Sequence, residues 1–307
     1  MRLSRLMVKS LCLSIVLGAA SAHLAAERHT PLGMSSEPIV EAGSVEIPPG
    51  LAGFSLSGPM VQGGLLLGKA SPGDQVYSDS TEVLVDADGN FVIGLDRDEP
   101  LQKKLVVVRN ELRHTLALDI ARRTYEIQRI EGVAQKYVSP APEQVARSRS
   151  DVQRVVEARA RLDTRLDFAS DFIWPVVGPI SGVFGSQRVY NGVPKRPHYG
   201  VDIARETGTP VIAPAAGVVT MAEDLYYSGL TIILDHGHGL SSSFLHLSSM
   251  AVEVGDVVEK GETLGEVGAT GRVTGPHLDW RMNWTGGSGN VRIDPALLVP
   301  PMPGSDQ

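Results

Sequence analysis

Short apolar runs separated by turn residues fill the first half of the chain. Examples between residues 51 and 131 are FSLSG, GGLLLG, TEVLVDADGNFVIGL, KKLVVVRN and TYEIQRIEG. Runs of this length, rich in β-branched and aromatic residues, predict β-strands, and the DADGN turn at 86–90 predicts a hairpin between two of them. We therefore expect residues 51–136 to form a small β-sandwich of immunoglobulin-like character, preceded by an extended, proline-rich lead-in over 27–50.

The pattern changes between residues 137 and 169. After the proline-containing YVSPAP, apolar residues recur at helical spacing from 143 to about 166, with arginines between them. This spacing predicts one amphipathic helix inside a linker. The apolar positions are Val145, Val152, Val155, Val156, Leu162 and Leu166.

From residue 170 to about 300 the chain again alternates short apolar runs with glycine-rich turns, as in GVVTMAE, LTIILDHG, LSSSFLHL and HLDWRMNW. The pattern predicts a second β-rich domain over 170–300 with no helix of normal length, followed by a tail at 301–307. Within the last run, we expect Trp280 to pack in the core and Trp284 to lie at the rim.

Composition supports a mainly β fold and argues against nucleic acid as a binding partner. The chain has 33 glycines and 20 prolines in 307 residues, which favours many short strands and turns over long helices. Its formal net charge of -7 gives no bulk positive charge with which to bind nucleic acid.

The first 26 residues read as a secretory signal peptide. Arg2, Arg5 and Lys9 precede a short apolar run that ends in small residues, with a cleavage site after Ala22 or Ala26. No other stretch is apolar enough to span a membrane, so we expect an exported protein without a membrane span after cleavage. The absence of a basic wall-anchoring domain favours the periplasm of a Gram-negative cell.

The cysteine count restricts the chemistry. The one cysteine, Cys12, lies in the leader, so the mature chain would hold no disulfide, no zinc-thiolate site and no cysteine nucleophile.

Five of the eight histidines fall in the last domain, and their neighbours are informative. His198 and Asp202 stand four residues apart, and His277 and Asp279 stand two apart, so each pair shares one side of an extended chain. His246 alternates with Phe244 in a third run. Two His/Asp pairs that converge on a β-sheet can form a site for zinc or another divalent ion without cysteine.

These residues occur in motifs that resemble the lysostaphin-type (LytM-like) peptidoglycan zinc metallopeptidases. The motifs are HYGVDIA, LDHGHGLSSSFLHLS and KGETLGEVGATGRVTGPHLDW, in the family's order, and the resemblance covers roughly 172–298. It implies a β-rich peptidase domain with one Zn²⁺ per chain. His198 and Asp202 would be the first two ligands, and His246 and His277 would be catalytic. Cross-linked stem peptides of peptidoglycan would be the substrate.

The sequence departs from the family at the third ligand, where Asp279 stands in place of histidine. Carboxylate oxygen is a legitimate zinc donor, so we predict Asp279 as the third ligand. A His/Asp/Asp set carries one more negative charge than a His/His/Asp set, which would make bound zinc less Lewis-acidic.

The predicted reaction is peptide hydrolysis by water that the metal activates. His277 would act as general base, and His246 would stabilise the oxyanion or protonate the leaving amine, although the two roles could be exchanged. Thr270 and Arg272 are candidates for the wall of the substrate groove. His236 and His238, in a glycine-flanked turn, are interpreted as structural.

Two other classes of function compete with the enzyme. A metal-free LytM-type regulator would bind the cell wall or activate an amidase partner, and metal content would distinguish it. A lipoyl- or biotinyl-type carrier domain is suggested by VGDVVEKGETLGEVG alone, but Lys260 does not stand where a modified lysine is needed, and the histidines would be unexplained.

Overall fold

A computed structural model describes residues 45–132, 142–286 and 289–304. The predicted signal peptide and most of the lead-in lie outside the described residues. The described chain is mainly β, as the sequence predicts, and it holds one α-helix, α2 (Pro142–Ala158). No helix within the described ranges is both long enough and apolar enough to cross a membrane.

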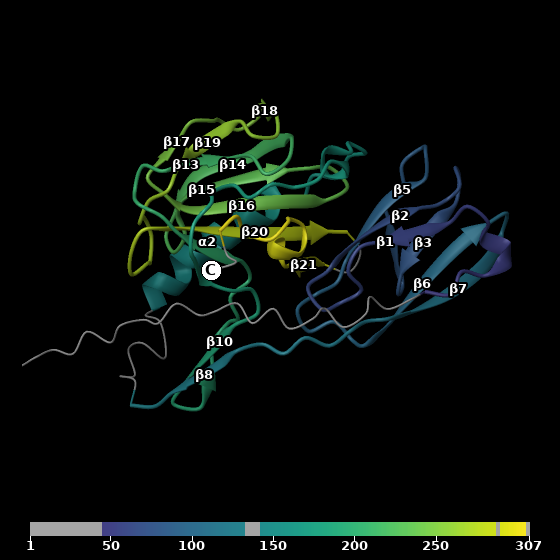
Figure 1. The fold of residues 1–307 in the computed structure, drawn as a ribbon, viewed down its shortest axis with the longest axis horizontal. Coiled ribbons are helices and arrows are strands. Elements are labelled where there is room, and N and C mark those ends of the chain that lie inside the picture. Colours follow the sequence, from purple (N-terminus) through teal and green to yellow (C-terminus); the bar gives the residue numbers. More distant parts are fainter. Residues whose placement is uncertain (1–44, 133–141, 287–288, 305–307) are drawn as a thin grey trace, which may run out of the picture. The chain divides into compact units, whose positions relative to one another are not determined.

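Two small antiparallel sheets form from the first half of the chain (Figure 1). Along one strand, β7 (Leu112–Asp119), Leu116 and Leu118 are buried while Ala117 between them is exposed, because successive side chains of a strand face opposite sides. The first sheet contains β1 (Ser55–Ser57), β2 (Leu65–Lys69) and β5 (Asn90–Gly94). The second contains β4 (Thr81–Val83), β3 (Gln75–Ser78), β6 (Gln102–Arg109) and β7 (Leu112–Asp119).

The hairpin predicted at DADGN is wrong in its strand pairing. The turn itself forms, since the Asp86 carboxylate accepts from the backbone N–H groups of Asp88 and Asn90. The strands on either side, however, belong to different sheets, because β4 pairs with β3 and β5 pairs with β2. The turn therefore connects two sheets instead of closing one.

The helix is shorter than its sequence pattern suggests. α2 ends at Ala158, and the expected continuation to about Leu166 is wrong. Val155 and Ala158 pack on Met221, Leu225 and Ile233 of the large sheet described next. The last helical backbone hydrogen bonds run from Arg159 to Val155 and from Ala160 to Glu157. The chain then leaves the helix and forms the short 3₁₀ turn η2 (Asp167–Ala169).

An eight-stranded sheet dominates the second half of the chain, and β14, β15, β16 and β20 run side by side in it (Figure 1). In sheet order its strands are β18 (Val257–Val258), β14 (Gly217–Leu225), β15 (Gly229–Asp235), β16 (Leu240–Leu247), β20 (His277–Thr285), β12 (Val201–Ala204) and β9 (Ile180–Gly182), with β21 (Asn290–Ile293) also paired to β20.

Smaller elements complete the fold. β8 (Ile127–Ile130) pairs in parallel with β10 (Gln187–Tyr190), so the end of the predicted first domain joins a strand of the second. The remaining elements are β11 (Val193–Pro194), β13 (Pro210–Ile212), β19 (Thr263–Glu266), β17 (Ser249–Met250), η1 (Pro49–Leu51) and η3 (Pro295–Leu297). The domain boundaries and the immunoglobulin-like character of the first half stay predictions.

Successive side chains of β20 alternate between two faces of the sheet, so core residues lie on one face and candidate site residues on the other. Leu278, Trp280 and Met282 are fully buried on one face, which leaves His277 and Asp279 on the other. Trp284 continues the buried face at 3% exposure, so its expected position at the rim is wrong. The strand continues in β conformation to Thr285, and Trp284 therefore keeps the same phase as the core residues.

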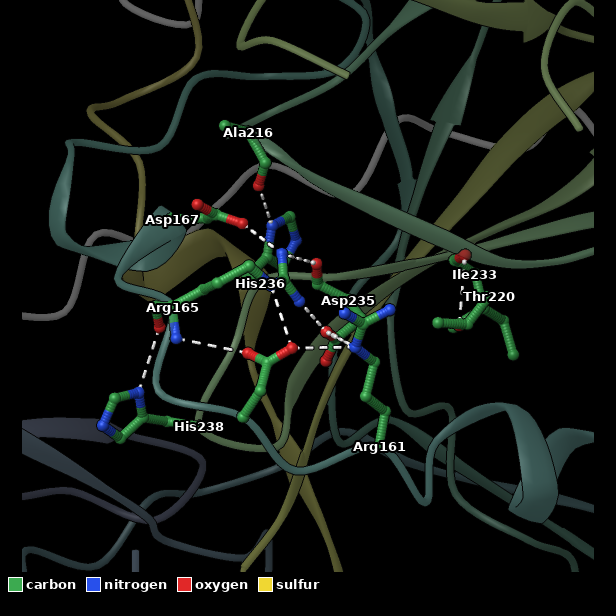
Figure 2. A network of polar contacts seen from close by, with 10 residues as sticks. Arg161, Arg165, Asp167, Ala216, Thr220, Ile233, Asp235, His236 and His238 are labelled. Atoms are coloured by element: carbon green, nitrogen blue, oxygen red, sulfur yellow. Dashed lines mark hydrogen bonds and ion pairs between the residues drawn. The ribbon is translucent and has the colours of Figure 1, made fainter. Parts of the chain in front are cut away.

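An arginine from the segment after α2 anchors that segment to the turn between β15 and β16. Figure 2 shows the Arg165 guanidinium between Asp167 and Asp235, with which it forms ion pairs. The backbone carbonyl of Arg165 also accepts from His238 Nδ1, at 3.0 Å. These contacts join the non-helical segment 159–166 to the end of β15 and the turn after it.

His236 is a buried structural residue, as its sequence context predicts. Its Nδ1 donates to the Ala216 carbonyl (2.6 Å, Figure 2), and its Nε2 hydrogen-bonds with the Ser242 hydroxyl (2.8 Å). Both ring nitrogens are therefore occupied within the fold. Burial lowers the pKa of His236 to about 4.

This buried imidazole predicts a loss of stability in acid. Because the folded pKa lies below the unfolded value of about 6.5, the contribution is complete above that pH and is lost as pH falls towards 4. The loss should reach about 3 kcal/mol. Urea denaturation between pH 7.5 and 4 should give a shallower pH dependence for His236→Gln than for the unsubstituted chain. Parallel pH profiles would contradict this assignment.

Candidate metal centre

The pairing of β12 with β20 places two carboxylates opposite each other. In this antiparallel ladder Asp202 is the direct partner of Asp279. Like charges placed directly across a strand pair repel, so this arrangement needs a positive charge beside it.

His198 reaches the same place from the loop before β12. Its backbone N–H donates to the Ser186 carbonyl, and its carbonyl accepts from the Gly185 N–H, both at 2.8 Å. His198 lies outside any helix or strand, and these two backbone hydrogen bonds fix its loop. The imidazole Nε2 then lies 2.9 Å from Asp202 Oδ1 and 3.7 Å from Asp279 Oδ2.

The three side chains have the geometry of a metal-binding group. One potential ligand atom from each of His198, Asp202 and Asp279 lies within 4.8 Å of the others. Burial lowers the pKa of His198, but its hydrogen bonds to the two carboxylates outweigh burial and raise the pKa to about 10. The carboxylates thus favour positive charge between them.

Two glycines make room for the carboxylates. A Cβ built on Gly182, in β9, would lie 2.3 Å from Asp202 Oδ2. A Cβ built on Gly200 would lie 2.5 Å from Asp279 Oδ1. Both distances are far too short for real contacts, so any larger residue at either position would displace a candidate ligand.

Arg281 is a member of this site that the sequence reasoning missed. Its Nε donates to Asp279 Oδ1 and Oδ2 at 2.9 and 3.0 Å, and its Nη2 donates to Oδ2 at 2.5 Å. Burial raises the pKa of Asp279, but Arg281 and His198 outweigh it and hold the pKa well below its ordinary value. The separation of two residues along β20 places both side chains on one face, which is the signal that could have found it.

The two candidate catalytic histidines lie side by side. The ring centroids of His246 and His277 are 5.0 Å apart. Nδ1 of His246 donates to the Thr270 carbonyl and Nδ1 of His277 donates to the Gly275 carbonyl, both at 2.9 Å. A carbonyl only accepts, so in each neutral ring the proton is on Nδ1 and Nε2 carries a lone pair.

These lone pairs are available for proton transfer beside the ligand group. His277 Nε2 lies 3.8 Å from Asp202 Oδ1. Burial lowers the pKa of His246 below its ordinary value, which keeps that ring neutral near pH 7. His246 also has a positive φ of 67°, in the region that L-residues rarely adopt, so the end of β16 bends at this residue.

The two residues predicted for the groove wall, Thr270 and Arg272, have different surroundings in the structure. The Thr270 carbonyl orients His246, and its hydroxyl donates to the Leu247 carbonyl at 2.7 Å. Arg272 lies over the Tyr227 ring, 5.8 Å from the centroid, and is exposed. Neither belongs to the candidate metal group, and their contact with substrate stays a prediction.

The donor set fits a divalent cation. One imidazole nitrogen and two carboxylate oxygens suit zinc, and the second carboxylate makes the set harder than one with two imidazoles. Within the described residues, His236 and His238 are not part of any such group. The assignment of His198, Asp202 and Asp279 as ligands is therefore consistent with the geometry and stays a prediction.

Comparison with known proteins gives one family match. Residues 196–295 match peptidase family M23. A crystal structure from Pseudomonas aeruginosa assigned to peptidase M23 is similar over 78% of this chain and 94% of that one, with 30% identity and a TM-score of 0.60.

Curated relatives match over shorter segments. The peptidoglycan DD-endopeptidase ShyA of Vibrio cholerae is 41% identical over 105 residues, which is 34% of this chain and 24% of that protein. The DD-carboxypeptidase/endopeptidase Mpg of Neisseria meningitidis is 37% identical over 112 residues, 36% of this chain and 26% of that protein. The matched segment thus spans about a quarter of these relatives.

Proposed function

The chain belongs to peptidase family M23, and from that premise we propose that it is an exported, zinc-dependent endopeptidase that hydrolyses peptide cross-links of peptidoglycan. The observation that carries the proposal is the candidate group of His198, Asp202 and Asp279 with two lone-pair Nε2 atoms beside it. Two relatives named as DD-endopeptidase or DD-carboxypeptidase/endopeptidase support peptidoglycan as the substrate.

In the proposed mechanism His198, Asp202 and Asp279 hold one Zn²⁺. When bound, zinc supplies Lewis acidity that polarises a peptide carbonyl and acidifies water. His277 lies beside the ligand Asp202, so we assign its Nε2 to accept the proton of the attacking water. His246 Nε2 would receive that proton from His277, whose ring centroid lies 5.0 Å away, and would pass it to the oxyanion or to the leaving amine. The backbone carbonyls of Thr270 and Gly275 hold both rings in the required tautomer.

We propose periplasmic localisation on the signal-peptide pattern of residues 1–26 and on the wall-directed names of the relatives. Substrate would be reached outside the cytoplasmic membrane, where cross-linked stem peptides lie.

The proposal is tested by measuring both the zinc content of the protein and its digestion of peptidoglycan. The full chain is expressed, and the mature protein is purified from the periplasm after residues 1–26 have been removed. It should contain about one zinc per chain by plasma mass spectrometry, and it should release cross-link fragments from purified peptidoglycan. A chelator should stop the digestion, and added zinc should restore it. A chain that purifies without metal and digests nothing would replace this proposal by the regulator that acts through an amidase.

A further inference from the structure

Asp279 differs from the other candidate ligands because an arginine side chain, that of Arg281, donates hydrogen bonds to it. Its side chain is only 3% exposed, and the three donor contacts from Arg281 reach both of its oxygens. Such a planar fork fixes the orientation of a carboxylate as well as its charge. Oδ2 is the oxygen closest to His198, at 3.7 Å.

Neighbouring arginines do not share this contact. Arg159 donates to the Ser243 hydroxyl at 2.8 Å, and Arg292 donates to Asn283 Oδ1 at 3.1 Å. Among the described residues, the other candidate carboxylate, Asp202, forms its ion pairs with His198 and His277. The Arg281 fork therefore holds Asp279, the aspartate that stands where the sequence resemblance implies a ligating histidine.

Charge explains why the two residues belong together. An Asp279–Arg281 pair is formally neutral, as a neutral imidazole is. With Arg281 counted, the set of His198, Asp202 and Asp279 carries one net negative charge, which equals the charge of a His/His/Asp set. Arg281 also relieves the repulsion between Asp202 and Asp279, which face each other across β12 and β20.

We propose that Arg281 is a positioning residue for the metal centre, and that Asp279 and Arg281 together take the place of a single ligating histidine. This inference rests on the proposed zinc site. The fork orients the carboxylate towards the ion, and its positive charge keeps the ligand set at the charge that suits a Lewis-acidic zinc.

If Asp279 and Arg281 act as one unit, the substitution Asp279→His alone should not give a working histidine ligand. An imidazole at 279 would leave the partly buried Arg281 guanidinium beside a cation and without its carboxylate. An imidazole is also larger than a carboxylate, and the space near Gly200 is narrow, since a Cβ built on Gly200 would lie 2.5 Å from Asp279 Oδ1. The single substitution should therefore impair metal binding, and removal of the guanidinium should relieve it.

A double-mutant cycle on the mature chain tests this. The zinc dissociation constant is measured by competition with a chromogenic chelator for the unsubstituted protein, Asp279→His, Arg281→Gln and the double variant. Loss of an outer partner of a ligand should weaken zinc binding about 10- to 100-fold in Arg281→Gln. Asp279→His should also weaken it, and the double variant should bind more tightly than either single variant.

Two further variants separate charge from geometry. Arg292→Gln removes a charge from the same neighbourhood without touching Asp279, so its zinc affinity should stay within about 2-fold. Arg281→Lys keeps the charge but loses the fork, so it should restore affinity only in part. Full recovery by lysine would overturn the positioning role.

The outcomes distinguish this inference from the proposed function. Additive effects in the cycle, or an Arg281→Gln variant that binds zinc as the unsubstituted chain does, would overturn the role of Arg281 and leave the peptidase intact. Zinc binding with the expected coupling but without peptidoglycan digestion would support the Arg281 role and overturn the peptidase. A chain that binds no zinc would overturn both.

Discussion

Replacing His198 by alanine is expected to remove bound zinc and reduce peptidoglycan hydrolysis by at least about 10³-fold, because metal chemistry supplies several kcal/mol of transition-state stabilisation. Asp202→Ala should give the same result. Neither side chain belongs to the buried apolar core, so far-ultraviolet circular dichroism should remain that of the β-fold. Zinc content and digestion are measured on the same preparations.

A matched control for this expectation is His114→Ala. His114 lies in β7, outside the candidate metal group, and its loss should leave zinc content and hydrolysis unchanged. Undiminished hydrolysis by His198→Ala would mean that the zinc centre is assigned to the wrong residues.

Substitution of the two candidate catalytic histidines should affect catalysis without affecting metal binding. His246→Ala and His277→Ala should each keep about one zinc per chain and lose about 10²- to 10⁴-fold in hydrolysis rate, the range for a lost general acid or base. Neither ring belongs to the candidate ligand group of the described residues, and each Nδ1 donates to a backbone carbonyl. Zinc analysis and initial rates on soluble cross-linked peptides provide the measurement.

A loss of zinc in either variant would move that histidine into the ligand group. The double substitution should be little slower than the slower single one if the two imidazoles act in one proton-transfer sequence, because residues that act as a unit are not additive. Fully multiplicative losses would mean that they act independently.

The local pattern of the sequence was sufficient for the parts of the site that depend on one strand. A period of two along HLDWRMNW places His277 and Asp279 on one face and Leu278 and Trp280 on the other, and the structure has this separation. The mainly β class followed for the same reason, since alternation and turn residues are properties of short segments. The motifs shared with the M23 family were equally local.

Pairing partners could not be read from the same pattern. DADGN forms the turn that its residues favour, yet β4 and β5 join different sheets, because strand pairing depends on contacts between segments that are distant in sequence. The end of α2 at Ala158 has a similar cause. The segment after Ala158 makes contacts such as the Arg165–Asp235 ion pair with residues that are distant in sequence, and helical spacing does not reveal such contacts.

At the candidate metal centre, the sequence alone determined which residue types could bind a cation and which strand faces carry them. The tertiary structure decided their surroundings: Asp202 lies opposite Asp279, and Gly200 leaves room for a carboxylate. It also decided that Arg281 turns back onto Asp279 instead of towards solvent. The physical reason is that residue type and strand period are local, whereas charge balance and available space are set by neighbours that only the folded chain brings together.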